Sequence, residues 1–326
     1  MLDSVRKKAP ALAGACLLAA STCLAQNYPS KPIRWIVPTA ASGAYDVAAR
    51  TLATPMANAL GQSILVDNRA AAAGIVGMEA IARAAPDGYT IGTAGVSQLT
   101  MHPHIYPKLP YDTRRDFAPI GMMVSLPLAL WVTPSVPAKS LQELLAYAKA
   151  NPGKLNYGSA GIGHSFHLAT ELLAERTGAV MTHVPYKGTA PALQDLVAER
   201  IQVMFYPPTG PMLNLVKDGK LRAFATASEK RFPTLPDVPT FEEAGVHEFD
   251  VAGWASLAAP AGTPREIVSR LNQELNRAVS SPETAKVYGK MGFVQVTSSP
   301  EELAQKIERE TRMWGSVIKR LGIKAE

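Results

Sequence analysis

Short apolar runs alternate with amphipathic stretches along the chain from residue 33 onward. Apolar runs bounded by turn residues predict buried strands, whereas apolar residues spaced three and four apart predict helices. The predicted strands are 33–37, 64–66, 89–93, 122–133, 155–157, 181–184, 201–205, 220–226, 251–258 and 293–296. The predicted helices are 45–60, 75–84, 141–150, one that begins at 163–165, and 190–198, 264–280, 282–291 and 300–321. Such an alternation is typical of the α/β class.

Two long strand-like passages, 122–133 and 251–258, bracket a self-contained α/β block. This arrangement predicts two lobes joined by a double crossover, in which both ends of the chain contribute to the first lobe. We expect lobe one to comprise residues 26–125 and 253–326, and lobe two to comprise residues 126–252. A single larger α/β domain is the alternative.

The stretch 156–175 combines a strand end, a loop with glycines at 158, 161 and 163, and an amphipathic helix. Glycines allow left-handed backbone conformations, and the start of a helix presents unpaired N–H groups and a positive dipole end. The pattern is that of a carboxylate or phosphate site, or of a plain glycine-rich turn. A nucleophile elbow is excluded because Tyr157 stands where a glycine is needed, and no P-loop lysine follows. His164 and His167 lack a third ligand at metal-binding spacing.

Residues 1–25 have the features of a secretory signal: a basic start, an alanine-rich apolar run and a cleavage site after Ala25. Both cysteines, Cys16 and Cys23, lie inside this segment, so the exported chain would contain no thiol. A lipoprotein anchored at either cysteine is the alternative. No later stretch of the sequence is long and apolar enough to cross a bilayer.

The formal net charge of +6 is small and the basic residues are not clustered. This balance argues against nucleic acid or an anionic membrane as a partner. A small acidic ligand is compatible with it.

Several motifs occur in a characteristic order along the chain: 28–33 (YPSKPI), 86–90 (PDGYT), 109–112 (LPYD), 116–120 (DFAPI), 183–188 (HVPYKG), 219–222 (GKLR) and 259–264 (APAGTP). In this order they resemble the Bug-type substrate-binding proteins of tripartite tricarboxylate transporters. The resemblance implies a two-lobed periplasmic binding fold of type II, the Venus flytrap, with two crossover strands. It also implies a monomer in the periplasm that binds a small organic carboxylate, delivers it to membrane permease subunits, and uses no cofactor or metal.

In that family, two loops of lobe one and the glycine-rich loop of lobe two hold the ligand. Transferred to this chain, the loops are 38–46, 68–77 and 159–165. The candidate binding residues in these loops are Ser42, Gly43, Tyr45, Asp46, Gly74, Ile75, Ser159, Ala160, Gly161, Gly163, His164 and Ser165, and Tyr206, at the end of a lobe-two strand, is a further candidate. Asp46 is expected to support its loop by accepting backbone hydrogen bonds.

The chain departs from the family pattern in both lobe-one loops. Residues 41–43 read Ala-Ser-Gly where Pro-Gly-Gly is usual, and Ile75 stands where an asparagine is usual. Tyr45, His164, Phe166 and Tyr206 add aromatic surface. These changes favour an aromatic or otherwise largely apolar mono- or dicarboxylate over citrate.

Two other functions remain open at this point. A ligand-sensing receptor for a membrane sensor kinase would need the same binding chemistry. A secreted hydrolase would use Ser159 as nucleophile with His164 or His183, although no acid is placed beside either histidine in the sequence.

Overall fold

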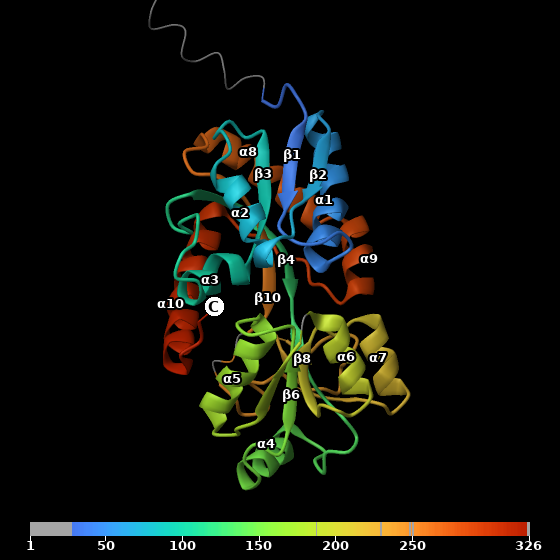
Figure 1. Ribbon diagram of the computed structural model, residues 1–326. Helices are drawn as coiled ribbons and strands as arrows, with labels where there is room; N and C mark the ends of the chain where they lie inside the picture. Colours follow the sequence, from blue (N-terminus) through green and yellow to red (C-terminus); the bar gives the residue numbers. More distant parts are fainter. Residues whose placement is uncertain (1–27, 187, 229, 248, 250, 325–326) are drawn as a thin grey trace, which may run out of the picture.

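The computed structural model describes residues 28–324 except 187, 229, 248 and 250. Two five-stranded sheets, each flanked by helices, form two lobes that lie one above the other (Figure 1). The predicted signal segment 1–25 lies outside the described residues. The two-lobed α/β prediction is confirmed.

The first sheet has the order β2-β1-β3-β10-β4. Its strands are β1 (Ile33–Val37), β2 (Ile64–Asn68), β3 (Thr90–Gly95), β4 (Phe117–Leu126) and β10 (Gly253–Pro260). β1 pairs in parallel with β2 and β3, whereas β10 runs antiparallel between β3 and β4. The carboxyl ends of the three parallel strands therefore lie at one edge of this sheet, where α/β proteins bind ligands.

The second sheet repeats this plan with the order β7-β6-β8-β5-β9. Its strands are β5 (Leu128–Val132), β6 (Asn156–Ser159), β7 (Thr182–Pro185), β8 (Val203–Tyr206) and β9 (Arg222–Ala227). β6 is parallel to β7 and β8, and β5 is antiparallel to β8 and β9.

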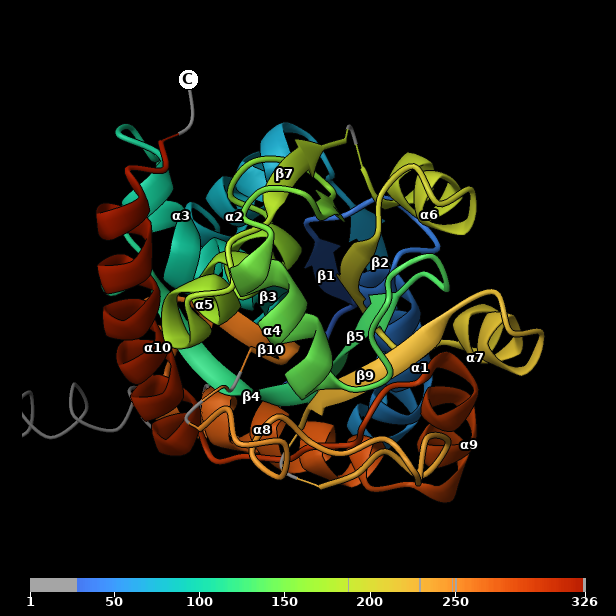
Figure 2. The same cartoon turned by 90° about the horizontal axis from the view of Figure 1, so that it is seen from below.

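The helices also fall into two sets, one flanking the sheet of each lobe (Figures 1 and 2). Those of the first lobe are α1 (Ala44–Leu60), α2 (Ile75–Ala82), α3 (His102–Ile105), α8 (Arg265–Val279), α9 (Pro282–Met291) and α10 (Pro300–Leu321), with a 3-10 turn at Ala72–Gly74 and a π-helix at Ser97–Met101. Those of the second are α4 (Leu141–Ala150), α5 (Ser165–Thr177), α6 (Thr189–Val197) and α7 (Gly210–Lys217). α10 packs against α3 and also against α5 of the other lobe, where Arg320 pairs with Glu175.

Two predicted strands are wrong. The passage 122–133 is not one strand: β4 ends at Leu126 and β5 begins at Leu128, so the chain changes sheets at Pro127. Proline lacks the N–H that a continuous ladder requires. Residues 293–296 form no strand, and only an isolated bridge joins Val294 to Ser125.

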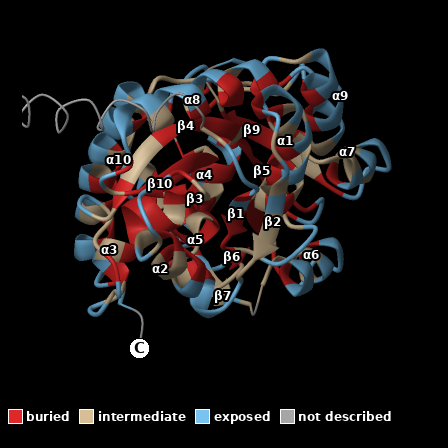
Figure 3. Ribbon diagram, turned by 90° about the horizontal axis from the view of Figure 1, so that it is seen from above, coloured by how far each residue is buried: buried red, intermediate tan, exposed pale blue. Residues whose placement is uncertain are grey.

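Buried residues line the strands of both sheets (Figure 3), and buried tryptophans anchor the core of each lobe. Trp35 on β1 donates to Thr93 Oγ1 at 2.9 Å, and Trp131 on β5 donates to the Tyr206 carbonyl at 2.7 Å. Trp254 on β10 donates to Glu310 Oε2 of α10 at 2.7 Å. The indole N–H groups of these three tryptophans are thus satisfied.

Among the described helices, none combines the length and the apolar character that crossing a membrane would need. Within the same residues, no group of three or more His, Cys, Asp and Glu side chains could hold a metal ion.

Candidate functional site

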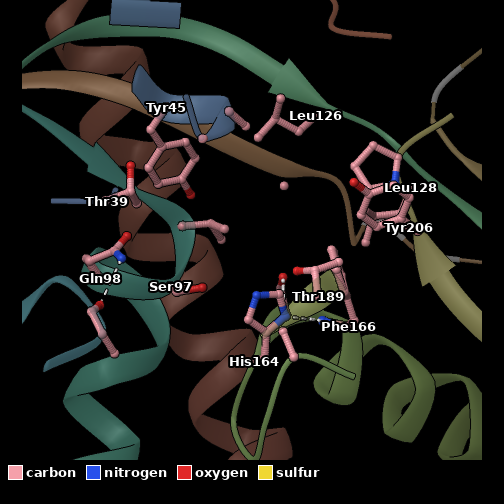
Figure 4. A pocket seen from close by; sticks show the side chains of 18 of the residues that line it. Thr39, Tyr45, Ser97, Gln98, Leu126, Leu128, His164, Phe166, Thr189 and Tyr206 are labelled. Atoms are coloured by element: carbon pink, nitrogen blue, oxygen red, sulfur yellow. Dashed lines mark hydrogen bonds between the residues drawn. The ribbon is translucent and has the colours of Figure 1, made fainter. Parts of the chain in front are cut away.

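A cavity of about 630 Å³ lies between the two lobes. Figure 4 shows its walls: Tyr45 and Gln98 come from lobe one, and His164, Phe166 and Tyr206 come from lobe two. The lining residues are Thr39, Ser42–Tyr45, Ala73, Val96–Gln98, His102, Ile105, Tyr106, Leu126, Leu128, Ala160, Ile162–Phe166, Thr189, Tyr206, Pro207, Thr209, Gly253, Met291 and Phe293.

Asp46 holds the first lobe-one loop in place. Its carboxylate is 3% exposed and accepts hydrogen bonds from the Ser42 N–H at 2.8 Å, Asn68 Nδ2 at 2.8 Å and Arg50 Nε at 3.0 Å. Burial acts to raise the pKa of Asp46, but the bonds from Arg50, Ser42 and Asn68 outweigh it and lower that pKa. The supporting role expected for Asp46 fits these contacts. Ser42 needs this support because its φ is +65°, in the left-handed region.

Replacing Asp46 with alanine should lower the free energy of unfolding by about 2 kcal/mol, since a buried N–H and an amide lose their acceptor. It should also weaken ligand binding, because Ser42 and Gly43 line the cavity. Urea denaturation and calorimetric titration measure the two effects. Glu79→Ala on α2 is a matched control, because Glu79 pairs with Arg83 at helical spacing away from the cavity. Equal stability of the Asp46 variant and wild type would contradict the prediction.

Ser159 and Gly161 shape the glycine-rich loop of lobe two. Ser159 Oγ donates to the Gly161 carbonyl at 2.9 Å and accepts from the Gly161 N–H at 3.2 Å. Gly161 and Gly163 have φ of +132° and +75°, conformations that favour glycine. A Cβ at Gly163 would lie 2.9 Å from Ile105 Cδ1 of lobe one, so the loop touches the opposite lobe.

Two helices begin at the cavity. α1 starts at Ala44 after Gly43, and α5 starts at Ser165 after its N-cap, His164. Their first N–H groups and positive dipole ends therefore converge on the cavity from opposite lobes, an arrangement that suits a carboxylate. His164 Nδ1 accepts from the Phe166 N–H at 3.3 Å, which orients the imidazole ring.

Aromatic rings form much of the remaining wall. The Phe166 ring lies edge-on to His164 at 4.4 Å and to Tyr206 at 5.8 Å between centroids. Tyr45 faces them from lobe one (Figure 4), and its hydroxyl donates to the Trp254 carbonyl at 3.2 Å. Burial raises the pKa of Tyr45 and lowers that of His164 to about 4, so both are neutral at pH 7.

Among the described lining residues there is no lysine, arginine, aspartate or glutamate. An anion here would be held by backbone N–H groups and helix dipoles, with apolar rings around it.

Behind the glycine-rich loop lies a stack of rings. His183 stacks on His167 at 4.0 Å and on Tyr157 at 4.8 Å. His183 Nε2 lies 2.7 Å from Ser159 Oγ, and His167 Nδ1 accepts from the Gly163 N–H at 3.1 Å.

The stack brings together the Ser159–His183 pair that a hydrolase would need, but it does not assemble a nucleophile. Ser159 is fully buried, and burial lowers the pKa of His183 to about 4, which makes it a weak base. Within the described part of the chain, no hydrogen bond joins His183 to a carboxylate. The stack instead fixes the loop.

Eight of the thirteen predicted binding residues line the cavity: Ser42, Gly43, Tyr45, Ala160, Gly163, His164, Ser165 and Tyr206. The other five are not among the lining residues. Asp46, Ser159 and Gly161 fix the loops. Gly74 has no Cβ and therefore leaves space beside it for the Pro38 carbonyl and the Gln98 side chain. Ile75 begins α2 and packs against the core.

The sequence interpretation missed the segment after β3. Ser97, Gln98, His102, Ile105 and Tyr106 all line the cavity. The signal was available, because a segment at the carboxyl end of a parallel strand lies at the ligand-binding edge. π-Helices, such as the one at 97–101, are also frequent at functional sites.

The family model described as "Tripartite tricarboxylate transporter family receptor" matches residues 48–323. The chain is 36% identical to Protein BugT of Bordetella pertussis over 305 residues, which cover 92% of each chain. It is 40% identical to "UPF0065 protein in tcbD-tcbE intergenic region" of a Pseudomonas species, over 89% of this chain and 86% of the relative.

Solved structures of related proteins are similar to this chain over most of its length. Rpa4515 of R. palustris with adipate has 33% identity and a TM-score of 0.78, covering 91% of this chain and all of that one. MatC of Rhodopseudomonas palustris with bound malate has 32% identity and a TM-score of 0.74, covering 89% and 100%. These relatives are substrate-binding proteins and not enzymes. The chain therefore belongs to the tripartite tricarboxylate transporter receptor family and is a solute-binding receptor of the Bug type.

Proposed function

We propose that this receptor closes on an aromatic or otherwise largely apolar mono- or dicarboxylate in the periplasm and delivers it to membrane permease subunits. The observation that carries the proposal is the cavity wall, in which two helix N-termini converge among neutral aromatic rings. The adipate bound to Rpa4515 supports the carboxylate class and shows a mainly hydrocarbon acid on a related chain. The malate on MatC supports the same class.

The carboxylate and the hydrocarbon part of the ligand would contact different groups of the cavity wall. A carboxylate accepts hydrogen bonds from N–H groups at the starts of α1 and α5, where the dipoles favour negative charge. The hydrocarbon part packs on Tyr45, Phe166 and Tyr206, at a gain of roughly 25 cal/mol per Å² of apolar surface buried. Citrate would leave at least one further carboxylate facing these rings without a cationic partner among the described lining residues.

A calorimetric panel of aromatic and aliphatic acids tests this proposal. Benzoate and phthalate isomers should bind more tightly than citrate. Replacing Phe166 with leucine keeps an apolar side chain but removes the ring contacts, so affinity for an aromatic acid should fall about fivefold. Affinity for adipate should change little in the same variant. Binding of citrate or malate with no response to the aromatic acids would contradict the proposed ligand class.

We further infer the assembly in which the receptor acts. The lobes would be residues 26–125 with 253–326, and 126–252, closing as a monomer after a signal peptide is removed at Ala25. Intact mass of the exported protein tests the processing, and a mass that includes residues 1–25 would reject it. Co-purification with permease subunits, with and without ligand, tests delivery, whereas capture of a sensor kinase alone would favour a signalling role.

A further inference from the structure

Eight side-chain atoms of the described residues are buried without a hydrogen-bond partner, and three of them belong to the wall of the same cavity. They are Thr39 Oγ1, Gln98 Oε1 and His102 Nδ1. All three come from lobe one, at the carboxyl ends of β1 and β3. A buried polar atom without a partner is rare and costly, so three in one wall mark a place that is suited to a polar group of a ligand.

Gln98 is held in place by its surroundings, beside the buried His102. Gln98 is 6% exposed and His102 is 5% exposed, one turn apart in the segment after β3. Gln98 Nε2 donates to the Ala73 carbonyl at 3.3 Å (Figure 4). A Cβ at Gly74 would lie 3.1 Å from Gln98 Nε2 and 2.8 Å from the Pro38 carbonyl, so both groups lie beside Gly74, and Figure 4 shows the Gln98 and Thr39 side chains on the same wall.

The orientation of the Gln98 amide limits the kind of group that this wall can bind. Since Nε2 faces a carbonyl, the unpaired end is the amide oxygen, which can only accept a hydrogen bond. An ionised carboxylate also only accepts, so it cannot satisfy this atom. A hydroxyl can, because it donates one hydrogen bond and accepts others. Thr39 Oγ1 is able to donate to that hydroxyl, and so is neutral His102 in the tautomer that carries its proton on Nδ1.

We propose that Thr39, Gln98 and His102 form a polar subsite of lobe one that binds a hydroxyl group of the ligand, so that the receptor prefers hydroxylated carboxylates to their unsubstituted counterparts. This inference rests on the proposed carboxylate-binding function and names a substituent that the bound acid carries. The carboxylate occupies the helix starts, and the hydroxyl reaches the wall behind Thr39. The three atoms are shielded from solvent in this conformation, so a rotation of the Thr39 side chain opens the subsite when the ligand enters, while Gln98 keeps its bond to the Ala73 carbonyl.

Matched acid pairs test the subsite by calorimetry on the whole exported protein: benzoate with 3-hydroxybenzoate, adipate with 3-hydroxyadipate, and succinate with malate. In at least one pair the hydroxylated acid should bind about tenfold more tightly to wild type, as one buried hydrogen bond is gained and an orphan acceptor is satisfied. Gln98→Met keeps the length of the side chain and removes the amide. It should reduce the preference to about twofold or less, because the hydroxylated acid loses more affinity than the unsubstituted acid does.

Two controls separate recognition from structure. Gln142→Met, on α4 at the far end of lobe two, loses an equivalent bond from Nε2 to the Ala244 carbonyl at 3.1 Å and should keep the wild-type preference. Thr39→Val removes a hydroxyl of the subsite and keeps the bond from Gln98 to the Ala73 carbonyl, and it should also reduce the preference for the hydroxylated acid. Equal binding within every pair, or an equal loss for both acids in Gln98→Met, would overturn the subsite while leaving the carboxylate function intact. Failure of all six acids to bind would overturn both.

Discussion

Replacing Gly95 with alanine should destabilise the protein by about 3 kcal/mol, an effect at the upper end for overpacking by one methyl group. Gly95 ends β3, and a Cβ there would lie 2.1 Å from the Tyr45 hydroxyl and 2.4 Å from its ring. The backbone of Gly95 is not among the positive-φ positions, so the strain comes from the contact with the tyrosine and not from the backbone conformation. The methyl group must push Tyr45 out of its place, and ligand binding should weaken with it.

A double-mutant cycle isolates this contact. In a Tyr45→Ala background the space is free, and alanine is favoured over glycine in a strand by roughly 0.5–1 kcal/mol. Gly95→Ala should then be neutral or stabilising, giving a coupling free energy of at least about 2 kcal/mol between the two positions. Urea denaturation of the four proteins measures it. The same destabilisation in both backgrounds would show that Tyr45 is not the obstacle.

This contact illustrates what local sequence patterns could and could not predict. Hydrophobic periodicity placed most strands and helices, because each element buries one face against its own sheet. It could not show that β3 needs a glycine at position 95. The Tyr45 side chain reaches that position only when α1 packs against the sheet. The break at Pro127 was visible in the sequence, yet the apolar residues on both sides made 122–133 read as continuous.

The site was predicted in part for a similar reason. Glycine spacing and the family resemblance located the 38–46 and 159–165 loops, whose backbone conformation is set locally at positions such as Ser42 and Gly161. Gln98 and His102 were missed because nothing in their immediate sequence marks them. Their proposed role depends on the π-helix after β3 and on their buried atoms without a hydrogen-bond partner, which are properties of the packed structure.

Lowering the pH from 7 to about 4.5 should destabilise the protein by at least about 2 kcal/mol through its buried histidines. Burial lowers the pKa of His102, His164, His167 and His183 to about 4 in each case, and His183 and His164 contribute further to the shift of His167. In the unfolded chain these histidines bind protons near pH 6.5. Between pH 6.5 and about 4 the unfolded chain therefore holds more protons, so acid favours unfolding.

The size of the effect follows from His102, the most buried of the four at 5% exposed. The pKa of His102 falls from 6.5 in the unfolded chain to about 4 in the folded protein, which corresponds to about 3 kcal/mol of stability that is lost as the pH falls between these two values. About 2 pH units of this range lie above pH 4.5. The pKa values of Asp46 and Asp67 are also lowered, in each case below the ordinary aspartate value of 3.8. Their contribution is lost only at still lower pH, so it does not mask the histidine window.

Urea denaturation at pH 7, 6, 5 and 4.5 measures this dependence. His102→Leu, which has nothing to protonate at that position, should lose less stability across the series than wild type does. His247, whose side chain is 72% exposed, gives the matched control, and His247→Gln should follow the wild-type curve. A free energy of unfolding that stays flat from pH 7 to 4.5 would mean that these four histidines are solvated or protonated in the folded protein. In that case a neutral His164 could not be part of the carboxylate site.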